Sequence, residues 1–538
     1  MSRTDPSRDA TAKGPIRDES AQVAVVRMLE QSLPAPVERI DTHISRLFLT
    51  PDRAFKLKRA RALPYVDFTD PARRLDCCAA DVTLNGPHAP GLYLGTRDIT
   101  READGSLTLD GKGEVVDRLV EMRRFPADAL LSELAAAGRL TPLILDQTAD
   151  AVVALHRAAP RMPGGGARAM AGVLDINEAG FATGRVLDKG QIVRLNARFR
   201  AALDRHATTL DARAGQGLHR RCHGDLHLRN MVMWRGRPCP FDAIEFNEAL
   251  ASCDTGYDTA FLLMDLWQAG RHAEANRVAN RIADADDEEG FPLLPFFMAV
   301  RAAVRAHIAA TRASEDRADA ATREAQTETA ERYMELAETL LDEVPPRLVA
   351  LGGYSGSGKT TLARAVAPLF APPPGARVIE SDPTRKALFG VAPEAPLPPE
   401  AYESDVSAQV HDTMAGRAAA LVASGCPVII TAVHRIAADR AGIATAAGAA
   451  RFDGVALTAP AAVLRQRVAE RPRGASDATL SVLNHQLSGG ASAEGATTGD
   501  GWPALDVSGD REATVARLAA RLGLSPAPCP RSGSHGNH

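Results

Sequence analysis

The sequence has 538 residues, of which 45% are hydrophobic and 24% charged, values typical of a soluble globular protein with two or three domains. Its net charge of −4 provides no general attraction to nucleic acid or to an anionic membrane, so we predict neither as a partner. No apolar run approaches the ~20 residues of a membrane span, and the N-terminus lacks an apolar signal core, which predicts a cytoplasmic protein. Seven cysteines without a C-x-x-C pair favour reduced thiols over a disulfide framework or a zinc site.

Composition and apolar patterning divide the chain into five predicted segments. They are a disordered leader (1–21), a first domain (22–310), a helical linker (311–346), a second domain (347–523) and a disordered tail (524–538). Two prolines, Pro345 and Pro346, end the linker directly before an apolar run that predicts a strand. We therefore place the boundary between the two large domains near residue 346.

Residues 43–58 predict two strands joined by a turn at residues 50–53. Because side chains alternate along a strand, Ala54, Lys56 and Lys58 share one face of the second strand. A lysine on this face can hold ATP phosphates, with Ala54 leaving space for the base. The alternative is a solvated sheet edge.

Three polar residues near the middle of the chain have the types and spacing that phosphoryl transfer requires. Asp225 and Asn230 lie in HGDLHLRN, and Asp242 follows a strand-like run. Transfer to a hydroxyl needs a carboxylate to orient the acceptor and oxygen ligands for the metal ions. The pattern resembles the catalytic loop of the aminoglycoside phosphotransferase branch of the protein-kinase-like fold. That resemblance implies that Asp225 is the catalytic base and that Asn230 and Asp242 bind Mg²⁺.

The same resemblance assigns residues 43–58 to the ATP-binding sheet of a small lobe. It implies that Lys56 binds the phosphates, with Lys58 as the alternative, and that Asp81 is the acidic partner of the lysine. Because kinase-like folds usually use glutamate there, the shorter Asp81 predicts a weakened ion pair. Residues 114–125 would form the last small-lobe strand and a hinge, where the backbone near Met122 binds adenine.

Beyond this hinge, residues 127–210 have the helical spacing expected of a large lobe. His223 and His227 lack the cysteines or carboxylates of a metal site, so we expect them to support the catalytic loop. Asp254 and Asp258 are four residues apart, which predicts one helical face, and we expect a structural or loop-holding role.

Residues 352–361, GGYSGSGKTT, follow an apolar strand-like run and precede a helix-like stretch. They satisfy the phosphate-loop pattern G-x-x-x-x-G-K-[ST], in which backbone N–H groups surround phosphate oxygens. Lys359 can reach the β- and γ-phosphates, and the Thr360 hydroxyl can ligate Mg²⁺. The alternative is a structural turn. The predicted nucleotide-binding residues are Gly353, Tyr354, Ser355, Gly356, Ser357, Gly358, Lys359, Thr360 and Thr361.

Glu380 and Asp382 follow a second strand-like run, where ligands collect in an open parallel sheet. Asp382 can orient an accepting hydroxyl, or can instead cap a helix that starts near Pro383. Thr431 stands where many ATPases have the Walker B aspartate, which argues against a motor ATPase.

The second domain resembles small P-loop kinases of the gluconate and shikimate kinase type. That resemblance implies that Glu380 holds a metal-bound water and that Asp382 contacts the acceptor. It also implies a mobile lid that neutralises the transferring phosphate, with solvated helical arginines as the alternative. The predicted lid residues are Arg467, Arg471 and Arg473.

The order of domains resembles bacterial two-domain fusions described as aminoglycoside phosphotransferase-like plus ATP-binding protein, over about residues 22–520. The fold class implied is a two-domain chain of α/β and α+β type: a bilobal protein-kinase-like domain followed by a P-loop domain with a parallel sheet. The implied function is Mg²⁺- and ATP-dependent phosphoryl transfer to alcohol groups of small-molecule acceptors at two nucleotide sites. The alternative is a regulatory or scaffold protein in which one or both sites only bind or hydrolyse ATP, suggested by Asp81 and Thr431.

Overall fold

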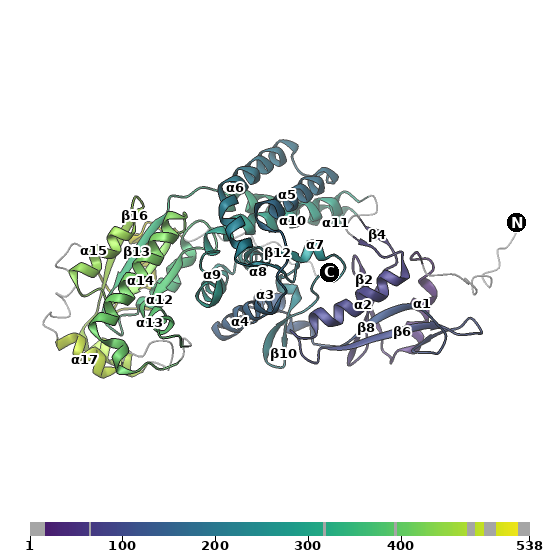
Figure 1. The fold of residues 1–538 in the computed structure, drawn as a ribbon, viewed down its shortest axis with the longest axis horizontal. Coiled ribbons are helices and arrows are strands. Elements are labelled where there is room, and N and C mark those ends of the chain that lie inside the picture. Colours follow the sequence, from purple (N-terminus) through teal and green to yellow (C-terminus); the bar gives the residue numbers. More distant parts are fainter. Residues whose placement is uncertain are drawn as a thin grey trace. The chain divides into compact units, whose positions relative to one another are not determined.

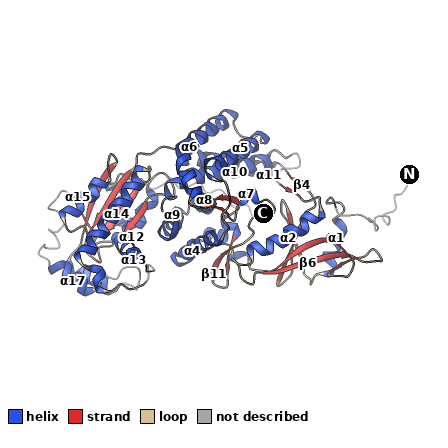
Figure 2. Cartoon of the chain, in the orientation of Figure 1, coloured by secondary structure: helices blue, strands red, loops and turns tan. Residues whose placement is uncertain are grey.

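The structure, a computed structural model, describes residues 17–63, 66–315, 319–391, 395–470, 479–488 and 502–525. The predicted tail beyond residue 525 and the first 16 residues of the predicted leader lie outside these ranges. Strands gather mainly in two sheets, and the segments between them in the sequence are mostly helical (Figure 2).

Contacts between residues divide the chain into two compact units. The first comprises Met1–Met170 with Ala207–Leu262, and the second comprises Ala171–His206 with Leu263–His538. The division passes through three helices, namely α5 (Gly166–Thr183), α6 (Lys189–Gly215) and α8 (Thr255–Gln268). The boundary predicted near residue 346 falls inside the second unit, because residues 263–346 group with the C-terminal part of the chain, to which α9 (His272–Ile282) is hydrogen-bonded.

The first unit contains a six-stranded antiparallel sheet in the order β1-β2-β3-β8-β6-β7. The predicted hairpin is confirmed, since β2 pairs with β3. Ser45 lies opposite Lys58 at one end of the pairing, and Leu49 lies opposite Ala54 at the other. The strands are β1 (Glu38–Asp41), β2 (Ser45–Leu49), β3 (Arg53–Lys58), β6 (Tyr93–Arg101), β7 (Leu107–Leu109) and β8 (Glu114–Arg123).

Helices cover both faces of this sheet. Phe55 and Leu57 of β3 pack with α1 (Val23–Ser32), whereas Ala54 packs in the cluster that contains Cys78 of α2 (Pro71–Asn85). Helix α2 lies along β6 and β8 (Figure 1). It begins at Pro71 because the Asp70 side chain accepts a hydrogen bond from the Ala72 N–H, which caps the helix. Side chains on the lysine face of β3 therefore point toward α2.

The remainder of the first unit surrounds the HGDLHLRN segment. It contains a short hairpin β4 (Ala62–Leu63) and β5 (Val66–Asp67), and the two-stranded sheets β9–β12 and β10–β11. The other elements are η1 (Ala127–Ala129), α3 (Leu131–Ala136), α4 (Pro142–Ala158), β9 (His219–Arg221), η2 (Leu228–Asn230), β10 (Met231–Trp234), β11 (Arg237–Pro240), α7 (Glu248–Ala251) and β12 (Ser252–Asp254).

The second unit begins with a helical part that contains α9 (His272–Ile282), the π-helical turn η3 (Ala283–Asp287), η4 (Phe291–Leu293), α10 (Leu294–Ala313) and α11 (Ala320–Leu340). Residues Phe291–Ala313 are long and apolar enough to cross a membrane, which the sequence analysis overlooked. However, 72% of the most apolar window is buried inside the protein, and α10 packs along α11. This helix therefore has the environment of a core helix.

The C-terminal part of this unit is built on a five-stranded parallel sheet in the order β14-β15-β13-β16-β17. Strand β13 is the central strand of this sheet, and helices α12 and α14 both contact it (Figure 1). The elements are β13 (Arg347–Gly352), α12 (Lys359–Val366), η5 (Ala367–Leu369), β14 (Arg377–Glu380), α13 (Ser381–Leu388), η6 (Pro399–Tyr402), α14 (Ser404–Ala423), β15 (Val428–Ala432), α15 (Ala437–Ala446), β16 (Arg451–Thr458), α16 (Ala461–Ala469), α17 (Leu480–Ser488), β17 (Ala504–Asp506) and α18 (Arg511–Arg521).

The fold class expected from the sequence is confirmed. An antiparallel sheet with its helix α2 precedes a mostly helical region, as in a bilobal kinase-like domain, and a parallel α/β sheet follows it. In the parallel sheet the chain leaves β13 toward β14 on one side and later returns to β16 on the other. Such a reversal marks the place where ligands bind in open α/β sheets.

Helix α9 covers the outer edge of β14. The Asn276 side chain donates hydrogen bonds to the carbonyl oxygens of Pro374 (2.9 Å) and Ala376 (3.0 Å), and the Asn280 side chain accepts one from the Val378 N–H (2.7 Å). Backbone groups at the edge of a sheet are otherwise available to pair with another strand. The side chains of Asn276 and Asn280, which lie outside the P-loop region, therefore form hydrogen bonds with backbone groups at this edge.

A buried arginine reinforces the contact between α9, η3 and β14. The Arg377 guanidinium is fully buried, lies 2.9 Å from Glu288, and also contacts Asp284 and Asn280. Glu288 in turn accepts hydrogen bonds from Arg417 of α14 at 2.6 and 2.7 Å. Burial lowers the pKa of Arg377, but the carboxylates of Asp284 and Glu288 outweigh it and raise that pKa above its ordinary value. The arginine thus remains charged.

Replacing Glu288 with alanine is expected to destabilise the second unit by about 2 kcal/mol, because a buried arginine loses a charged hydrogen-bond partner. Urea unfolding of the full chain, followed by far-UV circular dichroism, measures this change. The matched control is Glu335→Ala, which removes an exposed carboxylate from α11 of the same unit. Equal stability of the Glu288 and Glu335 variants would contradict a contribution of the Arg377–Glu288 ion pair to the stability of the second unit.

Candidate nucleotide sites

Two lysines of β3 share one buried carboxylate. Asp81 of α2 is fully buried, and its Oδ2 lies 2.8 Å from the Lys56 Nζ and 3.0 Å from the Lys58 Nζ. The weakened ion pair that we predicted from the short aspartate is therefore not observed. Helix α2 lies against the sheet, so the shorter side chain still reaches both ammonium groups. Burial raises the pKa of Asp81, but the two lysines outweigh it and lower that pKa to about 2.

The two lysines differ in their second partners. Lys56 contacts Asp242, whereas the fully buried Lys58 contacts Glu245, whose side chain is also buried. Burial lowers the pKa of Lys56, but the carboxylates of Asp242 and Asp81 outweigh it and raise that pKa well above its ordinary value. Lys56 is thus the lysine next to the predicted metal ligand, as preferred from the sequence. The sequence analysis missed Glu245, for which the only signal was its position three residues after Asp242.

The loop that carries Asp242 is held by two side chains of the small lobe. The Asp242 N–H donates to the Tyr93 hydroxyl (3.1 Å), and the Ala243 N–H donates to the Asn85 side-chain oxygen (2.9 Å). Asp242 has a φ of +62°, a conformation that non-glycine residues adopt at a cost of about 1–3 kcal/mol. Its side chain remains 42% exposed, so the carboxylate is accessible to a cation.

The HGDLHLRN segment brings Asp225, His227 and Asn230 together between β9 and β10. The Asn230 amide nitrogen donates to the Asp225 carboxylate (3.0 Å) and to its backbone carbonyl (2.9 Å). The Asn230 side-chain oxygen is therefore the atom that it can offer to Mg²⁺, which prefers oxygen ligands. The His227 Nε2 lies 3.3 Å from Asp225, and its ring packs edge-on against Phe261. His227 supports the loop, as we expected, although we had not placed it next to the predicted base.

Asp258 holds the beginning of this loop. Its carboxylate accepts hydrogen bonds from the N–H groups of His223 (3.1 Å) and Gly224 (2.8 Å), and it lies 2.9 Å from the His156 Nε2. Asp254, by contrast, ends β12 and pairs with Arg213 at 2.7 Å. The prediction that Asp254 and Asp258 share a helical face is therefore wrong, because α8 begins only at Thr255.

His156, Cys222 and Asp258 lie close enough together to suggest a metal site. A side-chain hydrogen bond with Cys253 and burial raise the pKa of Cys222 well above its ordinary value, which favours the neutral thiol. Asp258 already serves two backbone N–H groups and His156. We therefore interpret this cluster as support for the loop.

The phosphate loop has the conformation that its glycines permit. Gly353, Gly356 and Gly358 have φ values of +152°, +84° and +82°. A Cβ atom at Gly353 would lie 2.8 Å from the Leu457 carbonyl oxygen, so a larger residue does not fit there. Helix α12 begins at Lys359 without a side-chain cap, which leaves its first N–H groups available to an anion.

Lys359 and Thr360 point to different groups around this loop. The Lys359 Nζ donates to the carbonyl oxygens of Gly353 (2.7 Å) and Tyr354 (3.2 Å), so it folds back over the loop. The Thr360 hydroxyl donates to Glu380 (2.6 Å), which also pairs with Arg364 at 2.7 Å. Two predicted metal-binding side chains thus meet, and a hydroxyl beside a carboxylate fits a hard cation such as Mg²⁺.

The remaining predicted residues of this region have mixed outcomes. Asp382 lies in the first turn of α13 rather than at its cap, since Glu380 occupies the capping position without a side-chain hydrogen bond. Arg467 donates to the Val507 carbonyl (2.7 Å), which directs it toward the segment after β17. Arg471 and Arg473 lie outside the described residues. Thr361 is exposed on α12.

One contact to the phosphate loop had no signal in the sequence. The Gln486 side-chain oxygen of α17 accepts a hydrogen bond from the Ser355 N–H (3.0 Å). It therefore occupies a backbone donor of the kind that phosphate oxygens use. A nucleotide that binds this N–H has to displace Gln486.

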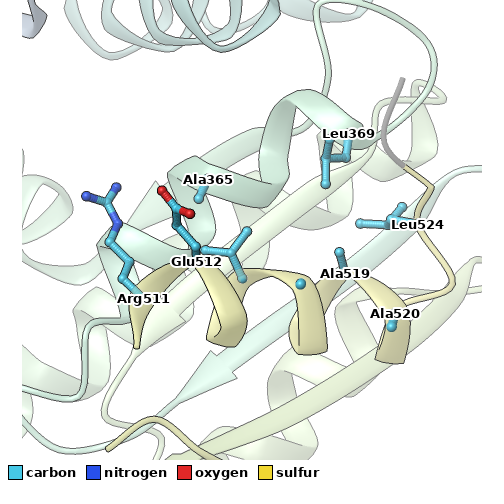
Figure 3. Close-up of a pocket in the computed structure, with 9 residues that line it drawn as sticks. Ala365, Leu369, Arg511, Glu512, Ala519, Ala520 and Leu524 are labelled. Carbon is cyan, nitrogen blue, oxygen red and sulfur yellow. The ribbon is translucent and has the colours of Figure 1, made fainter. Parts of the chain in front are cut away.

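A groove of about 700 Å³ lies on the side of α12 that faces α18 (Figure 3). Small and apolar side chains form most of it, with Arg511 and Glu512 at one end (Figure 3). Among the described residues that line it, none is a predicted site residue, so we assign it no role in phosphoryl transfer. The lining residues are Ala365, Leu369, Arg511, Glu512, Val515, Ala516, Ala519, Ala520 and Leu524.

Comparison with known proteins agrees with the geometry of the second unit. Residues 348–490 match the family model of an AAA domain. The match begins in β13 and includes the phosphate loop, Glu380 and Asp382. The predicted resemblance of this region to P-loop proteins is confirmed, and the AAA domain supports nucleotide binding by this unit.

Individual proteins are similar to this chain over different shares of its length. The uncharacterized protein Rv2004c of Mycobacterium tuberculosis (strain ATCC 25618 / H37Rv) is 27% identical over 458 residues, which cover 82% of this chain and 88% of that protein. A GDP complex of aminoglycoside 2'-phosphotransferase-IIIa is similar over 58% of this chain and 98% of its own, with 13% identity and a TM-score of 0.37. A gluconokinase from Sinorhizobium meliloti 1021 is similar over 34% of this chain and 98% of its own, with 24% identity and a TM-score of 0.24.

The geometry of Asp81 leads to a specific prediction. Asp81→Glu is expected to destabilise the first unit by about 1–3 kcal/mol and to weaken its ATP binding, because a longer side chain does not fit a fully buried position between two lysines. Calorimetric titration of the full chain with a non-hydrolysable ATP analogue measures the affinity. Asp76→Glu, on the same helix but outside this ion-pair cluster, is the control. Tighter binding by Asp81→Glu would mean that the native ion pair is weak after all.

Proposed function

We propose that the chain carries two Mg²⁺- and ATP-dependent phosphotransferase sites, one in each unit, that act on alcohol groups of small molecules in the cytoplasm. The observation that carries this proposal is that predicted phosphate and metal side chains from separate segments meet in both units. Lys56 contacts Asp242, 186 residues further along the chain, and the Thr360 hydroxyl donates to Glu380. Both pairs combine the cationic or hydroxyl group and the carboxylate that bound Mg·ATP requires.

At the first site, the roles follow from the charge and position of each side chain. Lys56, kept cationic by Asp81 and Asp242, binds phosphate oxygens. Asn230 and Asp242 would hold Mg²⁺, which neutralises charge on the phosphates when bound. Asp225, 40% exposed and hydrogen-bonded by Asn230, orients the acceptor hydroxyl and accepts its proton.

At the second site, backbone N–H groups contribute more to phosphate binding than at the first site. The loop after β13 and the start of α12 bind phosphate oxygens through N–H groups, and Lys359 leaves its carbonyl partners to follow the phosphates. Thr360 and Glu380 would hold Mg²⁺, which neutralises charge on the phosphates when bound. Asp382, which lies in the first turn of α13, accepts the proton of the acceptor hydroxyl.

Of the two residues that suggested the regulatory or scaffold alternative, one no longer supports it. Asp81 suggested a poorly held lysine, but its carboxylate lies within hydrogen-bond distance of both lysines. Thr431 still supports this alternative, since it is an uncharged, buried residue of β15. ATP turnover without an acceptor product is the outcome that would favour this alternative at the second site.

A screen of acceptors with γ-labelled ATP tests the proposal. The full chain is incubated with Mg·ATP and a panel of alcohols, aminoglycosides, amino alcohols and sugars. Asp225→Asn and Asp382→Asn assign each labelled product to one site, and the double variant is the control without transfer. We expect at least one product that depends on Asp225 and at least one that depends on Asp382. Products unaffected by either substitution would contradict the assigned bases.

A further inference from the structure

A buried histidine with a strained backbone follows the strand next to the phosphate loop. His434 lies two residues after the end of β15, is 1% exposed and has a φ of +48°. Its carbonyl oxygen and that of Arg435 accept hydrogen bonds from Arg440 at 2.8 and 3.0 Å. Buried contacts from α15 therefore hold this turn in a conformation that costs about 1–3 kcal/mol at a non-glycine residue.

The imidazole of His434 has unused hydrogen-bonding capacity. Within the part of the chain that the structure describes, neither its Nδ1 nor its Nε2 has a hydrogen-bond partner. Its neighbours are the ring of Trp502, 5.4 Å away, and the ring of His411, 5.7 Å away. His411 is itself paired with Asp439 at 2.8 Å. Burying polar atoms without partners is costly, so such a group in a folded protein requires an explanation, of which a bound molecule is one.

His434 lies on the ligand-binding edge of the parallel sheet. The Val433 carbonyl, one residue earlier, accepts a hydrogen bond from the Gly353 N–H of the phosphate loop (3.2 Å). A Cβ atom at Gly352 would lie 3.1 Å from the Trp502 ring and 3.5 Å from the His434 Cβ, so the end of β13 packs directly against these two side chains. In open parallel sheets, small molecules bind beyond the carboxyl ends of the strands. The histidine thus flanks the phosphate loop at this edge.

The charge state of the ring defines what it can bind. Burial, with the neighbouring charges of His411, Lys359 and Arg440, lowers the pKa of His434 to about 3. The ring is therefore neutral at physiological pH, with one nitrogen that donates a hydrogen bond and one that accepts. An anionic group can accept a hydrogen bond from the N–H but leaves the other nitrogen without a donor, whereas a hydroxyl both donates and accepts. A neutral hydroxylated molecule is the best complement.

We propose that His434 is an acceptor-binding residue of the second site and that it recognises an uncharged hydroxyl of a small polyol or sugar. This inference rests on the proposed phosphotransferase function of that site. His434 holds a hydroxyl of the acceptor, while Asp382 receives the proton of the hydroxyl that is phosphorylated. The ring binds and orients the acceptor and takes no part in the transfer of the phosphoryl group.

Stability provides the first test. Because the ring has no partner to lose, His434→Leu is expected to keep or raise the melting temperature of the full chain, as often occurs when a functional polar group is removed from a core. His156→Leu is the matched comparison, since His156 is equally buried but pairs with Asp258, and it is expected to lower the melting temperature. A fall for His434→Leu as large as that for His156→Leu would overturn the proposal by indicating a structural partner.

Transfer to neutral acceptors provides the second test. All variants carry Asp225→Asn, so that labelled product reports the second site, and the probes are glycerol, ribitol, inositol and common hexoses. His434→Leu is expected to lower kcat/KM for the neutral acceptor at least about tenfold, with unchanged Mg·ATP affinity and unchanged hydrolysis in the absence of acceptor. His434→Asn, whose amide also donates and accepts, is expected to recover part of the loss. His485→Leu, an exposed histidine of α17, is the control.

The outcomes separate this inference from the proposed function. A kcat/KM for the neutral acceptor that is unchanged by His434→Leu would overturn the role of His434. Mg·ATP binding without transfer to any neutral probe would overturn the proposed acceptor class. Failure of the second site to bind Mg·ATP would instead contradict the proposed function itself.

Discussion

Lys359→Ala is expected to weaken Mg·ATP binding at the second site at least about a hundredfold, because it removes a charged partner of the phosphates from a water-poor site. The Lys359 Nζ donates hydrogen bonds to the carbonyl oxygens of Gly353 and Tyr354, so it is positioned within the loop. Titration calorimetry of the full chain with a non-hydrolysable ATP analogue measures the loss.

The matched control is Lys189→Ala, an exposed lysine at the start of α6 in the same unit. Its affinity for the analogue is expected to equal that of the unmodified chain. A Lys359→Ala protein that binds as tightly as this control would disprove the assignment of residues 352–361 as a phosphate loop.

Asp225→Asn is expected to lower kcat at the first site by about 10²–10⁴-fold with little change in ATP affinity, because a general base contributes this much to transfer without binding the nucleotide. Asparagine is close in shape, so the hydrogen bonds from Asn230 and the contact with His227 impose no large rearrangement. Rates with the acceptor found in the screen and affinities from calorimetry separate the two effects.

Asp242→Ala provides the contrast to this variant. It removes the carboxylate beside Lys56 that would bind Mg²⁺, so it is expected to weaken Mg·ATP binding itself. If Asp225→Asn weakened ATP binding as much as Asp242→Ala while the chemical step kept its rate, Asp225 would be a nucleotide ligand and our assignment would be wrong.

Local sequence patterns were sufficient for the framework of both sites. The phosphate loop is contiguous, and both glycines that the pattern requires, Gly353 and Gly358, have positive φ. The hairpin with Lys56 follows from alternation, whereas Asp81 was expected from the resemblance, and the structure begins its helix at Pro71. In each case the chemistry and the conformation depend on residues that are close in sequence.

Contacts between distant segments could not be predicted in this way. Glu245 reaches Lys58 across 187 residues, and Gln486 reaches Ser355 across 131. Asn276 covers the edge of β14 from a helix that composition had assigned to another domain. No local pattern records which strand edge or buried lysine a distant side chain will meet.

Two local interpretations failed because tertiary structure overrides spacing. Asp254 and Asp258 have helical spacing, yet the pairing of β12 with β9 keeps Asp254 in a strand. Helix α10 escaped notice as a long apolar element because Arg301 and Arg305 interrupt its sequence. Arg301 is nevertheless buried, so the structure accommodates a charged side chain within this helix.

The central claim, that each unit has its own nucleotide site, is tested most directly by counting bound nucleotides. Titration of the full chain with a Mg²⁺ complex of a non-hydrolysable ATP analogue is predicted to give two binding events. Lys359→Ala is predicted to retain only one, Asp242→Ala only the other, and the double variant neither. A single binding event that persists in either variant, or two events that persist in the double variant, would contradict the account.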